Sequence, residues 1–100
     1  MIELGGNINL VGFKEIESSE LYVLKKIVGN YTRKFNDKCQ NFESITISLK
    51  KIHEIEDSAK YEIQVKLMND GKPINSEVTD NNLFVAVGDS LKKIESLVSS

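Results

Sequence analysis

The chain of 100 residues has one cysteine, one proline and no tryptophan. The single cysteine, Cys39, cannot form an internal disulfide and suits a reducing compartment, so we expect a cytoplasmic protein. No apolar run approaches the ~20 residues that a membrane span needs, and no basic segment followed by an apolar one begins the chain. We therefore expect neither a membrane protein nor a secretory signal.

The chain also lacks an excess of basic charge. Its 13 lysine and arginine residues are outnumbered by 15 acidic residues, which gives a net charge of -2. A non-specific nucleic-acid binder would be basic overall, so this balance argues against one. Hydrophobic residues make up 40% of the chain and charged residues 28%, which is typical of a globular protein rather than a disordered one. The length fits a single domain over residues 1–100.

Residues that bind metals or act as nucleophiles are sparse. His53 is the only histidine and no cysteine pair accompanies it, so we expect no metal site. The acidic residues that follow it indicate a solvated loop over residues 53–58. Cys39 has no histidine partner at a motif spacing, and we expect it to be a half-buried packing residue rather than a nucleophile.

The motifs of the common catalytic and cofactor sites are also missing. Gly5-Gly6 is not followed by the rest of a dinucleotide fingerprint, and it indicates a turn or a bulge. Asp80 is better explained as a helix cap, and Asp89 as a surface helix residue, than as acid or base catalysts. Nothing resembles a phosphate loop, a nucleophile elbow or a catalytic triad. We expect no enzyme and no cofactor.

Apolar residues at helical spacing predict two helices, over residues 18–38 and 81–98. Ser18-Ser19-Glu20 is the expected start of the first helix, where a serine hydroxyl can accept from the free amides of the first turn and Glu20 suits the positive end. Asp80-Asn81-Asn82 is the expected cap of the second. The apolar stripes comprise Leu21, Leu24, Val28, Tyr31 and Phe35, with Ile27 beside them, and then Phe84, Val87, Leu91, Ile94 and Val98, with Leu83 and Leu97 flanking.

Four strands are expected, in the region of residues 1–17 and over residues 44–52, 60–68 and 72–79. The second and third alternate apolar and polar residues, which indicates one buried and one solvated face. Asn69-Asp70-Gly71 predicts a hairpin turn, because these residue types tolerate positive φ. Pro73 cannot donate a ladder hydrogen bond, so it belongs at the start of the last strand or on a sheet edge.

The element order β-α-β-β-β-α predicts an α+β fold. A right-handed crossover makes the first two strands parallel, and the remaining strands follow as antiparallel hairpins. Because each helix and each strand has one apolar face, we expect a four-stranded mixed sheet with both helices packed on one face. The unpaired edge at residues 74–79 offers a second copy a place to pair as a homodimer, although Asn75 and Glu77 would weaken such pairing.

The segment 25–38 carries five basic residues and one acidic residue, and it is the only feature that indicates a class of partner. Basic side chains around an aromatic ring can bind phosphates and stack on a base. A solvated helix face, with basic residues toward its C-terminal end, is the alternative that charge alone favours. A glycine in this face either allows close packing or leaves a bare patch. Opposite the apolar stripe lie Tyr22, Lys26, Gly29 and Arg33, with Lys25 and Lys34 at the margins.

Two stretches carry a resemblance to a known family. A helix motif of an acidic and an apolar residue, then Tyr-Ala-Ala-Ile-Asp and a later Lys-Leu, is similar to Asn82-Leu83-Phe84-Val85-Ala86-Val87-Gly88 and Lys93-Ile94. An apolar turn with glycine and a spacer before a helix is similar to Val11-Gly12-Phe13 through Ile16-Glu17-Ser18. With its element order and length, the chain resembles the ribosome hibernation-promoting factors, also called ribosome-associated inhibitors or sigma-modulation proteins.

The resemblance implies a non-enzymatic RNA- or ribosome-binding domain that occupies the small-subunit cleft against rRNA. Such a role belongs to translation regulation in the stress response. Basic residues of both helices would then face phosphates. Together with Tyr22, the expected RNA-binding residues are Lys25, Lys26, Arg33 and Lys34 in the first helix and Lys92 and Lys93 in the second.

The chain departs from the family pattern at several points. Its second helix ends without a basic run, Gly88 replaces the aspartate of the motif, and the net charge is acidic. We expect no C-terminal dimerisation domain of the kind that long members carry. These departures fit a diverged relative that keeps the scaffold and has lost the ribosome. Two other functions stay open: a protein-interaction or homo-oligomerisation module on the same scaffold, and a small-ligand binder.

Overall fold

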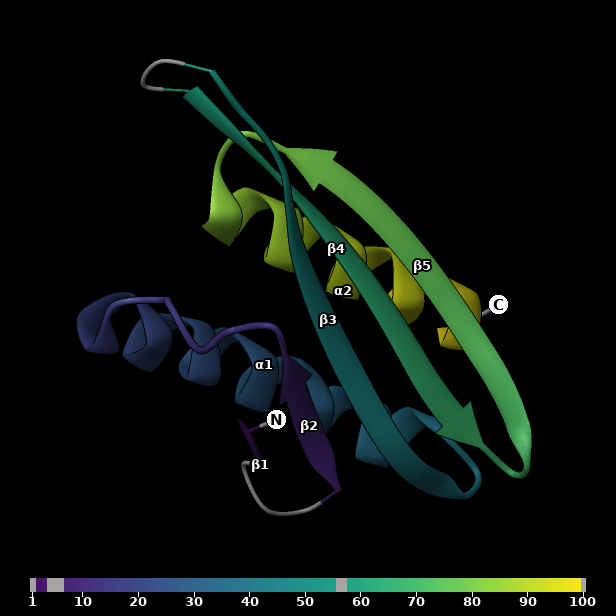
Figure 1. Cartoon of the computed structure of the whole chain (residues 1–100). Coiled ribbons are helices and arrows are strands. Elements are labelled where there is room, and N and C mark those ends of the chain that lie inside the picture. The colour runs from purple at the N-terminus through teal and green to yellow at the C-terminus, as the bar shows by residue number, and fades with distance from the viewer. Residues whose placement is uncertain (1, 4–6, 56–57, 100) are drawn as a thin grey trace.

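The described residues form strands and helices in the order β1-β2-α1-β3-β4-β5-α2 (Figure 1). This order comes from a computed structural model that describes residues 2–3, 7–55 and 58–99. The elements are β1 Ile2–Glu3, β2 Ile8–Val11, α1 Ser18–Lys38, β3 Phe42–Ile55, β4 Ser58–Asn69, β5 Lys72–Asp80 and α2 Leu83–Ser99.

The sheet has the strand order β1-β2-β3-β4-β5, so β5 lies at one edge. β2 runs parallel to β3, while the β3–β4 and β4–β5 pairs are antiparallel. The expected four-stranded mixed sheet is therefore confirmed in β2 to β5. The sequence does not separate β1 from β2, but the two residues of β1 pair antiparallel with β2, Ile2 opposite Leu10 and Glu3 opposite Asn9.

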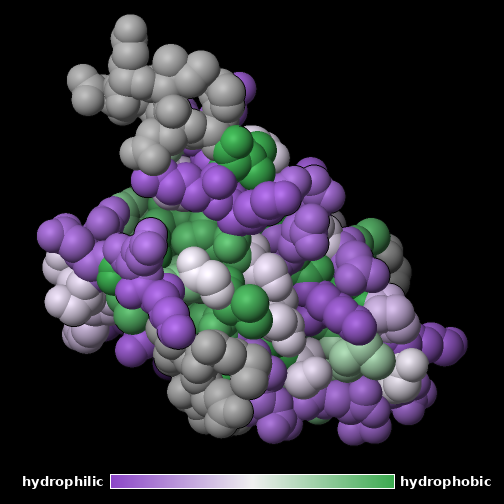
Figure 2. All heavy atoms as spheres, viewed as in Figure 1, coloured by the Kyte–Doolittle hydropathy of each residue, from purple (hydrophilic) through white to green (hydrophobic). Residues whose placement is uncertain are grey.

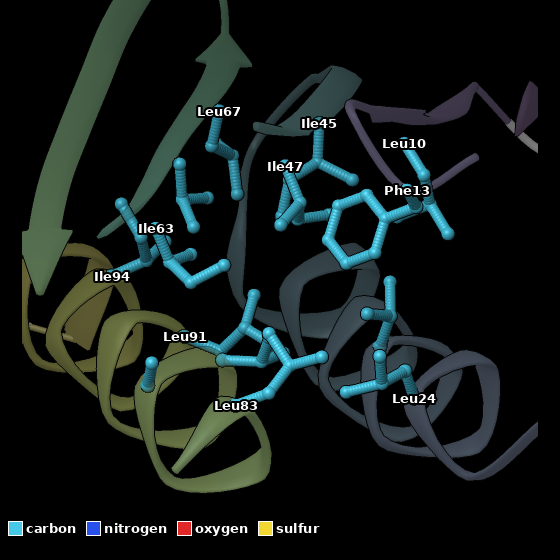
Figure 3. Packing of buried hydrophobic residues seen from close by; sticks show 14 of the residues in the cluster. Leu10, Phe13, Leu24, Ile45, Ile47, Ile63, Leu67, Leu83, Leu91 and Ile94 are labelled. Atoms are coloured by element: carbon cyan, nitrogen blue, oxygen red, sulfur yellow. The ribbon is translucent and has the colours of Figure 1, made fainter. Parts of the chain in front are cut away.

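Both helices cover the same face of the sheet, as expected (Figure 1). Their apolar sides meet the apolar face of the strands, and the core lies between the two layers (Figure 3). On the face that Figure 2 shows, hydrophilic residues surround a hollow in which hydrophobic residues are visible. Burying one large aliphatic or aromatic side chain contributes roughly 1.5–3 kcal/mol, so this cluster is the main source of stability. Its members are Leu10, Phe13, Leu24, Val28, Phe35, Ile45, Ile47, Ile63, Val65, Leu67, Leu83, Ala86, Val87, Leu91 and Ile94.

Two hydroxyl groups are buried with this core, and each has a hydrogen-bond partner. Thr32 Oγ1 donates to the carbonyl oxygen of Val28 at 2.8 Å, and Ser90 Oγ donates to that of Val87 at 2.8 Å. The carbonyl oxygen of Ser90 in turn accepts from Ser76 Oγ of β5 at 2.8 Å. These bonds remove the cost of burying the hydroxyls, and the last one ties β5 to α2.

Glu17 accepts the first hydrogen bond of α1. This residue is the N-cap, and within the described residues no side chain makes a capping hydrogen bond to the first turn. The helix begins at Ser18, as expected, but the expectation that a serine hydroxyl caps it is wrong, because the N-cap residue is Glu17. The Leu21 N–H donates to the Glu17 carbonyl oxygen at 2.8 Å. Glu20 lies in the first turn, as expected, where a carboxylate suits the positive end of the helix.

An asparagine cap begins α2. Asn82 Oδ1 accepts hydrogen bonds from the N–H groups of Phe84 at 2.9 Å and Val85 at 3.2 Å, which confirms the expected cap and makes Leu83 the first residue of the helix. The buried stripe differs from the expected one. Leu83 is buried in the core, whereas Phe84 is only partly buried and Leu97 is 52% exposed.

The β3–β4 hairpin is longer than the sequence predicts. β3 extends to Ile55 and β4 begins at Ser58, with the backbone of His53 opposite Lys60, which corrects the expected loop over residues 53–58. Within that loop, residues 56–57 lie outside the described part of the chain. A register shift just before His53 interrupts the ladder, and beyond it both strands extend past the helices (Figure 1). The strands were predicted from alternating apolar and polar residues, a pattern that reflects burial of one face. The pattern stops where the core ends, although the backbone pairing of the two strands continues.

Two tight turns require positive φ. Asp70 and Gly71, with φ of 52° and 76°, connect β4 to β5 and confirm the predicted hairpin turn. Gly12 has φ of 84°, and a Cβ added there would collide with the backbone carbonyl oxygen of Leu49 in β3. Glycine is therefore required where the chain leaves β2. Pro73 lies near the start of the edge strand β5, as expected.

Candidate nucleic-acid interface

The outer side of α1 presents a group of exposed basic residues around a tyrosine. Leu24, Val28 and Phe35 are buried against the sheet. At about 3.6 residues per turn, the positions on the opposite side of the helix point to solvent. We call four of these exposed residues the α1 basic face: Tyr22, Lys25, Lys26 and Arg33.

Tyr22 and Lys26 form one unit on this face. The Lys26 ammonium lies 4.7 Å from the centroid of the Tyr22 ring, which is cation–π geometry between residues one turn apart. The Tyr22 side chain remains 60% exposed. An exposed ring beside a cation provides a stacking surface for a base or a sugar and a positive charge for the adjoining phosphate.

Gly29 leaves a bare patch in the same region of α1. A Cβ added at Gly29 would have nothing within 4 Å. Of the two alternatives for this glycine, close packing is therefore excluded and the bare patch is confirmed. The helix backbone is open to close approach between Lys26 and Arg33.

Lys34 lies on a different side of α1 from the basic face. Its Nζ is 3.6 Å from Glu95 Oε2 of α2, and Lys38 Nζ is also 3.6 Å from the same oxygen. We call these three residues the Glu95 clasp. Lys34 Nζ also lies 5.0 Å from the centroid of the Tyr31 ring. The clasp faces α2, whereas helical spacing carries Tyr22, Lys26 and Arg33 to the far side of α1.

The two lysines of α2 lie near β5, away from the α1 basic face. Lys93 Nζ donates a hydrogen bond to the carbonyl oxygen of Glu77 at 3.2 Å. Lys92 and Lys93, together with Asp89, line a groove of about 450 Å³ beside the end of β5. The seven expected residues therefore occupy separate parts of the surface. Sequence spacing does not predict this separation, because the rotation of each helix is set by its packing.

The sheet face opposite the helices is polar. Its strands line a shallow depression of about 730 Å³ with the residues Thr46, Ser48, Gln64, Val65, Lys66, Asn75, Ser76 and Glu77. In the part of the chain that the structure describes, no aromatic residue lines this depression. The stacking residues of a typical RNA-recognition sheet are therefore missing from this depression.

Two glutamates meet on this open face. Glu62 in β4 and Glu77 in β5 are diagonal neighbours, because Glu62 lies opposite Thr79 and Glu77 opposite Gln64. A side-chain hydrogen bond with Glu62 and repulsion by its charge raise the pKa of Glu77 above its ordinary value of 4.5. The sequence does not predict this pair, since it depends on the β4–β5 register.

The other candidate catalytic residues have structural roles or are exposed, while the side chain of His53 lies outside the described part of the structure. Cys39 is half-buried at the C-cap of α1, and burial raises the pKa of its thiol, which disfavours the reactive thiolate. Asp80 Oδ1 accepts from the Asn82 N–H at 2.8 Å, while Asp89 is exposed. No group of three or more metal-ligating side chains occurs in the described residues. Within the same ranges, neither helix combines the length and apolar character of a membrane span.

This fold is similar to those of two solved structures. One is a ribosomal subunit interface protein from Coxiella burnetii, at 15% identity and a TM-score of 0.63 over 93% of this chain and 91% of that one. The other is the N-terminal domain of Protein Y from Thermus thermophilus, at 22% identity and a TM-score of 0.56 over 91% of each chain. No protein-family model and no curated protein matches the sequence. The expected hibernation-factor-like fold is therefore confirmed.

Proposed function

We propose that this chain is a non-enzymatic, ribosome-associated domain that binds rRNA of the small subunit through the α1 basic face. It acts in the cytoplasm, in the regulation of translation under stress. The observation that carries the proposal is the exposed group of Tyr22, Lys25, Lys26 and Arg33 on a fold shared with a ribosomal subunit interface protein.

The charge distribution supports a local contact rather than general nucleic-acid binding. The net charge of -2 repels a polyanion at long range, so attraction must come from a few cations at one place. Lys25, Lys26 and Arg33 supply three such cations, and Tyr22 adds a surface for stacking. The bare backbone at Gly29 lets a phosphate or a sugar approach the helix between them.

Each role follows from the position of the residue. In this proposal Arg33 and Lys26 contact phosphates on either side of Gly29, while Lys25 extends the contact toward the margin of the face. Lys34 contributes less, because its ammonium is shared with Glu95. Lys92 and Lys93 reach a different part of the surface and would require a second RNA segment.

Co-sedimentation with small ribosomal subunits at several salt concentrations tests this proposal. The wild type should bind at low salt, and the double variant Lys26→Glu/Arg33→Glu should lose binding. The matched control Lys60→Glu/Lys66→Glu makes the same charge change on β4 and should keep it. For single neutral variants, the slope of log affinity against log salt should fall by about one unit per lost phosphate contact. Absence of wild-type binding at low salt, or equal losses in both double variants, would contradict the proposal.

A further inference from the structure

The outer edge of β5 carries backbone groups that pair with no other strand of the described sheet, and the ladder shows which residues they belong to. The Ile45 N–H donates to the Asn7 carbonyl oxygen on the β2 side at 3.0 Å. Along a strand, the backbone N–H and carbonyl groups of successive residues point to opposite sides. Those of Ser48 in β3 therefore point toward β4 and bond with Gln64 opposite it. The backbone N–H and carbonyl of Gln64 then point away from β5. Glu77 lies opposite Gln64, so its own N–H and carbonyl point outward, away from β4.

A second contact agrees with this assignment. Lys93, which lies in α2 outside the sheet, donates to the Glu77 carbonyl oxygen at 3.2 Å. A carbonyl bonded into the β4–β5 ladder would point the other way. By alternation, the outward residues of β5 are Pro73, Asn75, Glu77 and Thr79.

We propose that this edge pairs antiparallel with β5 of a second copy, centred on Ser76, so that two sheets join into one. In this register Asn75 lies opposite Glu77 of the second copy, and the two exchange backbone hydrogen bonds. Ile74 faces Val78 on the helix side of the sheet. Lys72 faces Asp80 at the two ends, which places opposite charges across the strands.

Neighbouring registers lack this complementarity. Centring the pair on Glu77 would place the Glu77 side chains of the two copies directly opposite, and like charges there are destabilising. Centring it on Asn75 would place Lys72 opposite Val78 and leave Asp80 beyond the paired strand. Only the Ser76 register pairs the strand over its whole length, so β5 complements itself better than it complements an arbitrary peptide.

Lys93 competes with this pairing. The carbonyl oxygen that Lys93 occupies is the one that would accept the Asn75 N–H of the second copy. Lys93 also lines a groove of about 430 Å³ along the edge, together with Ser76, Ser96 and Leu97. Pairing therefore requires the lysine to swing out of the edge, which makes the wild-type dimer weak. This inference is independent of the RNA-binding role proposed for α1.

Sedimentation equilibrium up to about 1 mM protein tests the pairing, since a weak dimer has a Kd in that range. Lys93→Met should lower the dimer Kd about tenfold, because two symmetry-related hydrogen bonds are gained. Lys92→Met removes the same charge from the adjacent position and should leave Kd at the wild-type value. Lys72→Glu in the Lys93→Met background should reverse the gain. Monomers throughout for both wild type and Lys93→Met would overturn the proposal, as would an equal gain from Lys92→Met.

Cross-linking tests the register separately. Ser76 would lie opposite Ser76 of the second copy in a non-hydrogen-bonded pair. Their Cα atoms would be about 4.5 Å apart, a spacing that a disulfide can bridge. Ser76→Cys in a Cys39→Ser background should form a covalent dimer on mild oxidation, whereas Thr79→Cys in the same background should not. Cross-linking of Thr79→Cys alone would show that the register is wrong.

Discussion

The ammonium of Lys93 lies 3.2 Å from the carbonyl oxygen of Glu77, so a lysine of α2 covers the edge of β5. The same side chain would be needed for contacts to phosphates if α2 took part in RNA binding. A single ammonium cannot cover the strand edge and reach a separate RNA segment at once. The contact therefore makes α1 the better candidate for phosphate binding and gives Lys93 a role at the sheet edge.

Replacing Gly29 with alanine should stabilise the protein. Glycine costs about 1 kcal/mol relative to alanine inside a helix, and an added Cβ would meet nothing within 4 Å. Gly29→Ala should therefore raise the free energy of unfolding by up to that amount in a urea titration. Gly12→Ala is the matched contrast and should destabilise, because its φ is positive and its Cβ would collide with Leu49. A loss of stability in Gly29→Ala would contradict the helix position assigned to it.

The paired glutamates on the open sheet face predict a pH dependence of stability. The pKa of Glu77 is raised in the folded state, chiefly by its hydrogen bond with Glu62. Its stabilising contribution is therefore complete below the ordinary pKa of 4.5 and is lost as pH rises through the raised value. Glu62→Gln should remove this dependence and give a higher Tm than wild type at neutral pH.

The control for the glutamate pair is Glu43→Gln at the start of β3. It makes the same charge change in a different place, so it should leave the difference in Tm between acidic and neutral pH as in the wild type. The measurement is thermal unfolding followed by circular dichroism across the acidic to neutral range. Identical pH profiles for wild type and Glu62→Gln would show that the pair does not interact in solution.

The Glu95 clasp should contribute little to stability and should depend on salt. Both ion pairs are 3.6 Å long, and the Lys34 side chain is 54% exposed. A double-mutant cycle with Lys34→Met and Glu95→Gln should give a coupling energy of roughly 0.2–1 kcal/mol at low salt. The coupling should vanish near 1 M salt, where the Debye length is about 3 Å. A coupling that survives high salt would indicate a bond shielded from solvent.

Local chemistry accounts for the parts of the fold that were predicted well. The apolar spacing of α1, the Asn82 cap and the Asp70-Gly71 turn each depend on residues close together in the chain. The expected serine cap of α1 was wrong for a related reason. Several neighbouring residues can begin a helix, and here the path of the chain from β2 decides that the first turn closes on Glu17.

The candidate site was predicted less completely. Exposure of Tyr22, Lys25, Lys26 and Arg33 follows from the apolar stripe of α1 alone. The ion pair of Lys34 with Glu95 depends on where α2 packs beside α1. The contact of Lys93 with Glu77 depends on where α2 packs beside β5. Both depend on contacts between residues far apart in the sequence.

By itself, the sequence determined the order of the elements from β2 to α2, the two amphipathic helices and the β4–β5 turn, because periodicity and turn chemistry act over a few residues. Only the tertiary structure decided the register that brings Glu62 to Glu77, the helix rotation that separates Lys34 from Arg33, and the contact of Lys93 in α2 with the edge of β5. The strand register and the helix rotation depend on how whole apolar faces pack together, and this packing involves residues from the entire chain.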